Sequence, residues 1–336
     1  MLLSGETNRK VAGIDVSYQI VTLVISRDGQ MGKAREFKNT PQGHAALINC
    51  LRKAQVSRVC LEATGLYHLD LALEDAGFAV MVINPKAAKR FAEAMQSRTK
   101  TDAVDAAVLA EFAHRMPFQP WQRPDALALA IRACARRIAA LNKLQTQTKN
   151  QLHAAQQTAM TPDFLIAALQ CSIEHFDAQI EHLRRQVLDL IAANEKLQES
   201  LELLISVTGI AAASAIQLLG ELLVLPEDMS AKQGVAMTGL DPRAQQSGTS
   251  VNKKPRWSKA GNRYLRIALY MPTLSASRHD PKVRAYYHHL IDTRGLKKIQ
   301  AVCAVMRKLL LAIPAMLKNR RPFDSSRFYS PAETTA

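Results

Sequence analysis

The order of short apolar runs in residues 11–84 is the feature that most limits how this chain can fold. Residues 11–16 and 21–26 are β-rich, and the turn signal Asp28-Gly29 leads toward a third strand near residues 35–37. Helix and strand patterns then alternate, at residues 43–54, 58–62, 66–76 and 78–84. Three successive strands followed by helix, strand, helix and strand predict a mixed α/β domain in which the first and fourth strands lie side by side.

This order is that of the ribonuclease H-like fold, and it bears on four carboxylates. Asp15 ends the first strand, Glu62 ends the fourth, and Asp102 and Asp105 are spaced i, i+3 so that they share a helix face. Carboxylates at two neighbouring strand ends plus a helical pair make a hard-oxygen site suited to Mg²⁺ or Mn²⁺. Such sites serve phosphoryl chemistry, often with two metal ions about 3.5–4 Å apart.

Structural interpretations of the same acids must be weighed against this one. Asp102 could be a helix-terminal residue, Asp15 a turn residue and Glu62 a solvated strand end. The run Gly13-Ile14-Asp15 also occurs in actin-like ATPases and sugar kinases, but those folds need further glycine-rich loops. No glycine lies between Phe78 and Thr208. The four acids together, in this element order, favour the metal site.

The glycine-free region predicts long helices. Residues 125–208 contain one proline, Pro162, so two helices broken near residues 161–163 are expected. The second carries a heptad pattern with these a and d positions: Ile173, Ile180, Val187, Asn194 and Leu201; Phe176, Leu183, Leu190, Leu197 and Leu204. This pattern predicts a parallel coiled-coil dimer with Asn194 setting the register. The competing arrangement is an intrachain hairpin with residues 125–158.

Positive charge is concentrated in the last third of the chain. The chain has a formal net charge of +15, and residues 209–336 hold 20 Lys or Arg against 8 Asp or Glu. Between Arg243 and Arg278 there is no acid. This charge predicts binding of nucleic acid, whereas a membrane partner is not expected. The residues expected to contact nucleic acid are Arg243, Lys253, Lys254, Arg256, Trp257, Lys259, Arg263, Tyr264 and Arg266.

Two segments, one before this basic stretch and one within it, have recognisable local patterns. Residues 201–223 resemble a helix-hairpin-helix, with Ala211 where that turn usually has a second glycine. Residues 241–262 have loop character, and Ser247 before Gly248 reads by itself as an ordinary turn serine.

The cysteines and the apolar stretches bear on location. The five cysteines are scattered and never form a CxxC pair, which argues against zinc and disulfides and for a reducing compartment. Residues 1–10 lack an apolar signal segment, and Arg307 and Lys308 interrupt the apolar stretch 301–317. A cytoplasmic protein is expected.

Several motifs together resemble a known family. Gly13-Ile14-Asp15-Val16-Ser17, Glu62-Ala63-Thr64-Gly65, Ile83-Asn84-Pro85 and Lys100–Ala106 resemble the N-terminal motifs of the DEDD-type transposases of bacterial insertion-sequence family 110. Thr238–Arg243, Gln246-Ser247-Gly248, Ser258–Asn262 and Arg266–Pro272 resemble its C-terminal domain. The resemblance runs from about residue 11 to residue 325, in order.

The resemblance implies a division of the chain and a role for each site residue. The implied parts are a RuvC-like metal-binding domain (1–120), a helical coiled-coil region (121–204), a mainly α-helical transposase domain (205–326) and a tail (327–336). Metal would be held by Asp15, Glu62, Asp102 and Asp105, and Ser247 would be the nucleophile that forms a phosphoserine link. Donor and target DNA, a bispecific guide RNA and a homodimer or tetramer are the implied partners. The implied location is the bacterial cytoplasm, in association with the nucleoid.

Two other functions remain open from the residues. A RuvC-like junction nuclease would use a metal-bound water, with Ser247 incidental. A non-catalytic coiled-coil protein that binds nucleic acid would carry a vestigial site. A covalent protein–DNA adduct separates the transposase from the nuclease, and metal-dependent cleavage separates both from the binding protein.

Overall fold

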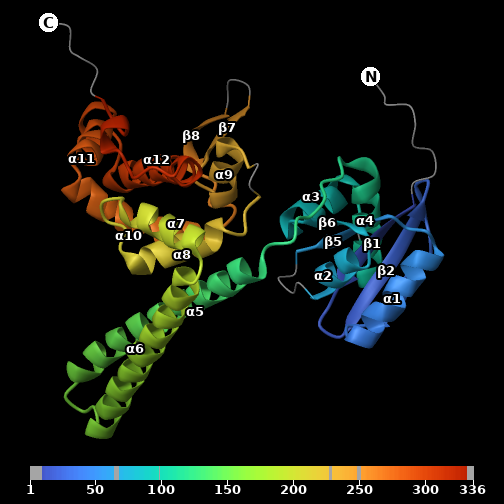
Figure 1. The fold of residues 1–336 in the computed structure, drawn as a ribbon, viewed down its shortest axis with the longest axis horizontal. Helices are drawn as coiled ribbons and strands as arrows, with labels where there is room; N and C mark the ends of the chain where they lie inside the picture. Colours follow the sequence, from blue (N-terminus) through green and yellow to red (C-terminus); the bar gives the residue numbers. More distant parts are fainter. Residues whose placement is uncertain (1–9, 64–67, 98, 227–228, 248–250, 331–336) are drawn as a thin grey trace, which may run out of the picture. The chain divides into compact units, whose positions relative to one another are not determined.

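The structure, a computed structural model, describes residues 10–63, 68–97, 99–226, 229–247 and 251–330. It divides into two compact units, unit 1 (residues 1–123) and unit 2 (residues 124–336). In Figure 1 unit 1 is coloured blue to teal and unit 2 green to red.

Unit 1 is built on a six-stranded sheet. Its strands are β1 (Lys10–Val16), β2 (Ile20–Arg27), β3 (Gln30–Met31), β4 (Arg35–Lys38), β5 (Arg58–Glu62) and β6 (Ala79–Ile83). The order is β3-β2-β1-β5-β6, with β4 also pairing with β2. β1 and β2 are antiparallel, whereas β1, β5 and β6 are parallel. The predicted strands and the predicted pairing of the first and fourth principal strands are confirmed, and the strand order is that of the ribonuclease H-like fold.

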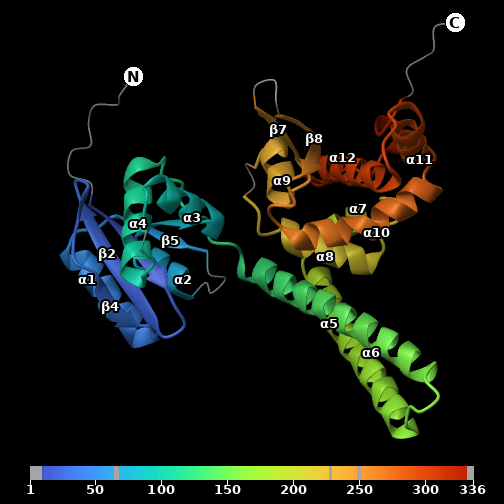
Figure 2. The ribbon, with the colours of Figure 1, turned by 180° about the vertical axis from the view of Figure 1, so that it is seen from behind.

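Helices cover both faces of this sheet (Figure 2). They are α1 (Pro41–Lys53), α2 (His68–Asp75), α3 (Pro85–Ala94) and α4 (Asp102–Arg115). Alternate strand residues face opposite sides, so Ala12 packs with the α1 and α2 cluster while Val11 packs with the α3 and α4 cluster. Each face therefore has its own apolar core.

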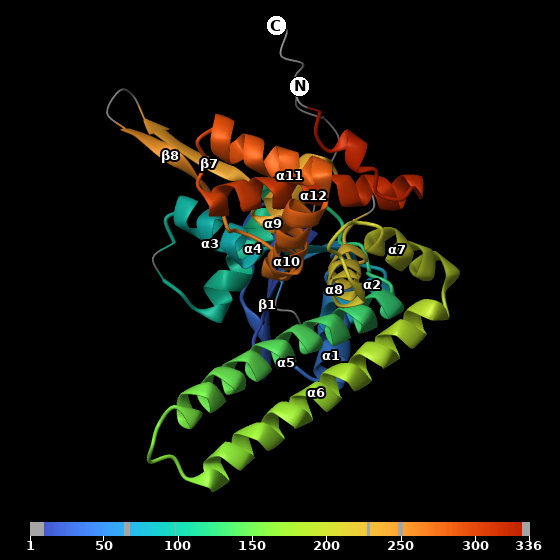
Figure 3. The ribbon, with the colours of Figure 1, turned by 90° about the vertical axis from the view of Figure 1, so that its left-hand side faces the viewer.

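Unit 2 begins with a long helical hairpin. Helices α5 (Ala126–Gln156) and α6 (Asp163–Ala192) lie side by side along their length (Figure 3). The predicted break near Pro162 is confirmed, because Pro162 is the N-terminal cap residue of α6. Ile138, Leu141 and Ile180 form the core of the hairpin, and Gln145 donates a hydrogen bond across it to Asp177.

The predicted five-heptad helix is wrong. α6 ends at Ala192, and Asn194 is the N-cap of α7 (Glu195–Ile205), where its side chain accepts from the backbone N–H of Leu197 at 3.2 Å. An N-cap asparagine satisfies a helix-terminal N–H, so its side chain serves the start of a new helix and does not set a coiled-coil register. The stripe at Ile180 and Val187 is buried within the chain, which is the competing intrachain arrangement.

The rest of unit 2 packs around one large apolar core. Its helices are α8 (Ala212–Leu222), α9 (Ala231–Thr238), α10 (Arg263–His279), α11 (Pro281–His288) and α12 (Lys298–Asn319), with short helices η1 (His289–Thr293) and η2 (Ser325–Arg327). By length and composition α12 could cross a membrane, yet eight of its residues are buried in the unit 2 core. It is therefore a core helix here.

Two predicted boundaries differ from the structure. The segment expected to be a loop contains an antiparallel hairpin, β7 (Pro242–Ser247) and β8 (Val251–Trp257). Its prolines lie at the first position of β7 and on a two-stranded sheet that has only edge strands, where a missing N–H is tolerated. The tail expected from residue 327 starts later, because Phe328 is buried among aromatic side chains.

Candidate active site

Strand register brings Asp15 and Glu62 to the same end of the unit 1 sheet. β1 and β5 are parallel, and Ile14 is paired with Leu61, so the next residue of each strand is an acid. Side chains alternate along a strand, so Asp15 shares the face of Val11, and Glu62 shares the face of Cys60. Val11 and Cys60 both pack with α3 and α4. Both carboxylates therefore lie on the side of the sheet that α4 covers.

Helix α4 supplies the other two acids from its first turn. Thr101 caps it, with its hydroxyl accepting from the Val104 N–H at 3.3 Å, and Asp102 and Asp105 follow. α4 lies directly on β1 because Gly13 has no side chain: a Cβ there would overlap the backbone of Ala106 and Ala110. This close approach sets the first turn of α4 over the end of β1.

The charges of these acids act on one another. Burial, then the charges of Asp102, Asp105 and Glu62, raise the pKa of Asp15 from 3.8 to about 6. Burial and the charge of Asp105 raise the pKa of Glu62, against an opposing effect of Lys100. Like charges with raised pKa values are the sign of a carboxylate cluster that a cation would stabilise.

The donor set fits a divalent metal ion, although the four acids are not yet arranged around one. Within the ranges that the structure describes, no three His, Cys, Asp or Glu side chains already form a group that could hold an ion. The carboxylates are close enough to repel but are not gathered at ligand distance. Four carboxylate groups on a fixed strand and helix framework are nonetheless the ligand chemistry that hard divalent cations prefer.

Ser247 lies at the far end of the β7–β8 hairpin. It pairs with Val251 in the hairpin register, and the strands shift between Arg243 and Gln245. The Ser247 side chain, like Gly248 and Ser250, lies outside the described residues. The structure therefore gives the serine a place at the tip of the hairpin and leaves its role a prediction.

The base of this hairpin is firmly fixed. Ser258 donates a side-chain hydrogen bond to the Asp241 carboxylate, and the Ser258 N–H donates to the Asp241 carbonyl at 3.0 Å. Gly239 and Gly261 have positive φ angles, and a Cβ on either would overlap neighbouring backbone. Two strands leave this base toward Ser247.

The cations expected to contact nucleic acid fall into two groups. Arg243 and Arg256 are paired across the hairpin and exposed, and Lys259 and Arg263 are exposed beyond it. Lys253 and Lys254 lie on β8, with side chains outside the described part of the chain. These residues remain candidates for phosphate contacts.

Three other residues that were expected to contact nucleic acid interact with residues of unit 2. Trp257 packs against the unit 2 core, and the Tyr264 ring lies 4.5 Å from the Arg136 guanidinium. Arg266 donates to the Thr238 carbonyl at 2.7 Å, and burial, with the charge of Arg263, lowers its pKa. These three side chains therefore have contacts within unit 2, and their contacts with nucleic acid stay a prediction.

The helix-hairpin-helix resemblance is confirmed only as helix, turn and helix. α7 and α8 flank the turn, in which Gly209 has a φ of +92°. A Cβ on Gly209 would lie 2.7 Å from the Pro272 carbonyl oxygen of α10. The turn therefore packs against another helix of unit 2.

Two useful residues were not singled out as site residues from the sequence. Lys100 acts on Glu62 and directly precedes the cap of α4. Gly13 permits the contact between α4 and β1. Both lie inside the motifs at residues 13–17 and 100–106, so their proximity to the acids in sequence was the available signal.

Comparison with known proteins adds family information to this geometry. Residues 12–160 match a model for a DEDD transposase domain of the IS110 type, and residues 201–288 match a model described as "Transposase IS116/IS110/IS902 family". The pilin gene-inverting protein of Moraxella bovis is 28% identical over 296 residues, covering 86% of this chain and 89% of the relative. That of Moraxella lacunata is 29% identical over 300 residues with the same coverage.

Two solved structures overlap with about a third of the chain. RuvC of T. thermophilus in complex with a Holliday junction substrate has a TM-score of 0.27 and 18% identity, over 34% of this chain and 99% of RuvC. A second Thermus thermophilus RuvC structure has a TM-score of 0.28 and 15% identity, over 33% and 99%. The strand order of unit 1 is the feature that identifies its ribonuclease H-like fold.

Proposed function

Because the chain belongs to the IS110 family of transposases, we propose that it moves an insertion element through a covalent phosphoserine link at Ser247, with divalent metal at the acids of unit 1. Membership makes the protein an enzyme that cleaves and rejoins DNA. The observation that carries the proposal is that Asp15 and Glu62 lie at the same end of the sheet, near enough to Asp102 and Asp105 for the charges to act on one another.

The metal site is the first part of the proposal. Asp15, Glu62, Asp102 and Asp105 would hold Mg²⁺ or Mn²⁺, and the bound cation would stabilise negative charge on the phosphate under attack. The acids themselves are held on β1, β5 and α4, which keeps the ligands on rigid elements.

The serine chemistry is the second part. The Ser247 oxygen would form a bond to phosphorus as the bond from phosphorus to one deoxyribose oxygen breaks. The serine proton leaves, and the released deoxyribose oxygen takes up a proton. The reverse reaction with the hydroxyl of another strand restores a phosphodiester and frees the serine, so no external energy source is required.

The exposed cations of the hairpin would hold the DNA backbone. Arg243 and Arg256 are opposite each other on the two strands, so a strand near Ser247 would meet both charges. The names of the Moraxella relatives concern inversion of a pilin gene, an outcome that also needs cleavage followed by rejoining.

The partners implied by the family complete the proposal. Donor and target DNA would be paired by a structured guide RNA, and two or more copies of the chain would act together in the bacterial cytoplasm. Sequencing of small RNA that copurifies with the protein, beside an Arg243→Ala and Arg256→Ala variant, would test the RNA partner. A copurifying pool without one enriched structured species would contradict it.

The central experiment is to trap the reaction and map the DNA-linked peptide by mass spectrometry. We expect a DNA adduct at Ser247 that needs Mg²⁺ or Mn²⁺ and is absent from Ser247→Ala, while the alanine variant still binds DNA. Metal-dependent cleavage without an adduct would instead support the hydrolytic nuclease. An adduct at Ser250 or Ser258 would show that another serine is the nucleophile.

A further inference from the structure

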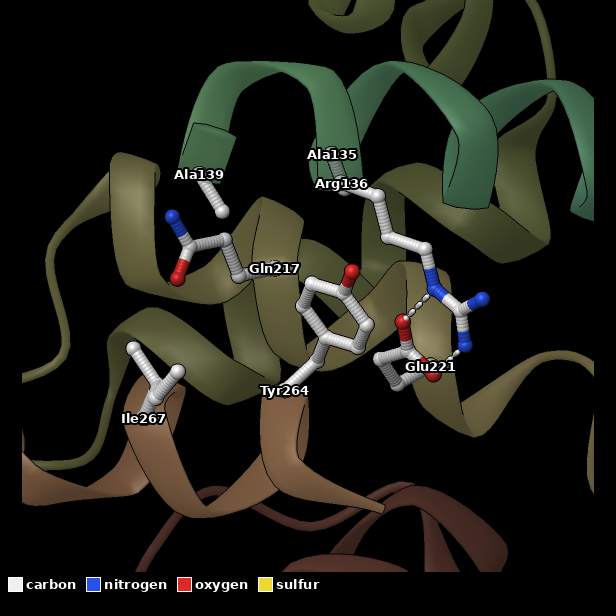
Figure 4. A pocket seen from close by; sticks show the side chains of 7 residues that line it. All are labelled: Ala135, Arg136, Ala139, Gln217, Glu221, Tyr264 and Ile267. Atoms are coloured by element: carbon white, nitrogen blue, oxygen red, sulfur yellow. Dashed lines mark hydrogen bonds and ion pairs between the residues drawn. The ribbon is translucent and has the colours of Figure 1, made fainter. Parts of the chain in front are cut away.

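A buried carboxylate on α8 connects the α5–α6 hairpin to the β7–β8 hairpin that carries Ser247, called the serine hairpin below. Glu221 is 1% exposed, and Arg136 of α5 donates to both of its oxygens, from Nε at 2.6 Å and from Nη2 at 2.9 Å. Asn262 donates to the same carboxylate from Nδ2 at 2.6 Å. Figure 4 shows Arg136 and Glu221 facing each other, with the ring of Tyr264 beside them.

Asn262 uses both ends of its amide group. Its side-chain oxygen caps α10 by accepting from the N–H groups of Tyr264 at 2.9 Å and Leu265 at 3.3 Å. Its side-chain nitrogen is committed to Glu221. The position of this residue is therefore fixed from two helices at once.

Asn262 is also close to the hairpin in sequence and in bonding. Its own N–H donates to the Met237 carbonyl at 2.6 Å, and the Lys259 N–H donates to the Gly239 carbonyl at 3.1 Å. Together with the two glycines that lack room for a Cβ, these bonds leave little freedom between Asn262 and the end of β8. A displacement of Asn262 would therefore be transmitted to the base of the hairpin.

The space around this network is too small for a ligand. The pocket that Arg136, Glu221 and Tyr264 line encloses about 10 Å³. That volume admits no more than about one water molecule. The volume beside the network leaves no room for a buried ligand larger than water, which favours a role in holding the chain.

Stability alone is a poor reason for this arrangement. Glu221 is buried, whereas the Arg136 side chain is 38% exposed. Burial of the carboxylate costs desolvation free energy that its attraction to Arg136 offsets only in part, so the net contribution of the pair to stability is small. What an apolar pair cannot supply is an oxygen that accepts from Asn262. The ion pair holds that acceptor in one orientation.

We infer that Glu221 and Asn262 are positioning residues that set the orientation of the β7–β8 hairpin, and with it the approach of Ser247 to DNA. The inference rests on the proposed function, since it assigns these residues to the Ser247 reaction. The effect acts through the base of the hairpin, and neither residue contacts the reacting atoms.

The first test removes the link and keeps the helix cap. Asn262→Ser retains a hydroxyl that can cap α10 but has no amide to reach Glu221. The matched control is Asn194→Ser, because Asn194 caps α7 in the same unit through a bond to Leu197. We expect the rate of Ser247–DNA adduct formation to fall about 10- to 100-fold in Asn262→Ser, with DNA affinity unchanged. Equal adduct rates in the two serine variants would overturn the inference.

The second test uses two double variants that differ only in the acceptor. Arg136→Met with Glu221→Gln keeps an oxygen for Asn262, and Arg136→Met with Glu221→Leu does not. The glutamine version should form adduct within about threefold of wild type, and the leucine version about 10- to 100-fold more slowly. Equal adduct rates in two folded double variants would contradict the role of the acceptor.

Amide hydrogen exchange does not depend on DNA cleavage, so it tests the positioning role of Asn262 separately from the proposed Ser247 reaction. Amide hydrogen exchange in residues 242–247 and 251–257 should be faster in Asn262→Ser than in Asn194→Ser, with equal exchange in the α5–α6 hairpin. Absence of any adduct in wild type would refute the proposed function, and the exchange measurement would still decide whether Asn262 holds the hairpin. Unchanged exchange would refute the link itself.

Discussion

The two regions assigned to the chemistry are built in opposite ways. The acids of unit 1 lie on β1, β5 and α4, elements that also supply buried residues to the core, and they repel one another. Ser247 lies at the end of a two-stranded hairpin whose described arginines are exposed and positive. In the proposed function the first region would hold a cation and the second a polyanion.

The two regions also differ in the interactions that fix the positions of their residues. The acid site takes its geometry from strand register and from the contact of α4 with Gly13, so its ligands are placed by the fold core. The serine hairpin takes its geometry from its base, where hydrogen bonds and two glycines hold it. Core packing determines the first, whereas polar contacts determine the second.

The largest expected effect is on strand cleavage, when one residue of the proposed chemistry is changed in either region. Asp102→Asn and Ser247→Ala should each reduce strand cleavage at least about 10³-fold, because each removes a group that the reaction needs. Added Mg²⁺ should raise the melting temperature of Ser247→Ala as it does in wild type, and much less that of Asp102→Asn. Calorimetric scans with and without Mg²⁺ measure this, and an equal metal response in both variants would contradict the assignment of Asp102.

The next effect concerns the framework of the acid site. Gly13→Ala should lower the free energy of unfolding by about 3 kcal/mol, because the added Cβ overlaps the backbone of α4. The control is Gly234→Ala in the middle of α9, where a Cβ meets nothing within 4 Å. That change should raise stability by about 0.5–1 kcal/mol, since alanine favours helix. Urea unfolding compares them, and effects of the same sign would refute the close approach.

A smaller effect separates crowding from burial as causes of a raised pKa. Burial raises the pKa of Asp70 from 3.8 to about 6, with no neighbouring carboxylate among its causes. The native protein then binds this proton more tightly than the unfolded chain, so the contribution of Asp70 to stability falls as pH rises from about 4 to about 6. Asp70→Asn should therefore be more stable than wild type by about 1–2 kcal/mol at pH 7 and similar below pH 4.

Measuring the stability of the variants with and without Mg²⁺ separates Asp70 from the acid site. The gain from Asp70→Asn at pH 7 should be the same with and without Mg²⁺, because Asp70 is not part of the acid site. A gain in stability from Asp15→Asn should appear only without Mg²⁺, where repulsion is uncompensated. Chemical unfolding at pH 4 and pH 7 reads out both, and a metal-dependent Asp70 effect would contradict the separation.

The smallest effect concerns the polyanion side of the comparison. Arg243→Ala should weaken DNA binding only a few-fold and reduce the salt slope of log affinity by about 1, as expected for one lost phosphate contact. Arg320→Ala is a matched control, because Arg320 is paired with Glu199. Fluorescence titrations at several salt concentrations measure the slope, and an unchanged slope for Arg243→Ala would remove it from the interface.

Sequence patterns predicted unit 1 better than unit 2. Alternation and turn signals placed five of the six strands of the unit 1 sheet within about two residues and missed the two-residue β3. Parallel pairing of β1 with β5 then placed Asp15 and Glu62 at the same end of the sheet. The heptad reading failed at Asn194, because a polar residue at an a position and an N-cap look the same in sequence. The bond between Gln145 and Asp177 joins residues 32 positions apart, and no local pattern predicts which polar side chains will meet across a hairpin.

The serine hairpin was missed for a related reason. Glycine, proline and lysine between residues 241 and 262 are poor strand formers, so local propensity favours a loop. Contacts of its base with α9 and α10 override that preference. The link from Glu221 to Asn262 spans 41 positions, which places it beyond any local reading as well.

The length of the α5–α6 hairpin can change without disturbing the rest of unit 2. Ile138, Leu141 and Ile180 form a core separate from that of the rest of unit 2. Insertion or loss of seven residues in each arm would move the tip by about 10 Å and return every remaining side chain to its own face. Relatives can therefore diverge in the reach of this arm, in whole-heptad steps, while selection on the acids and the serine hairpin continues undisturbed.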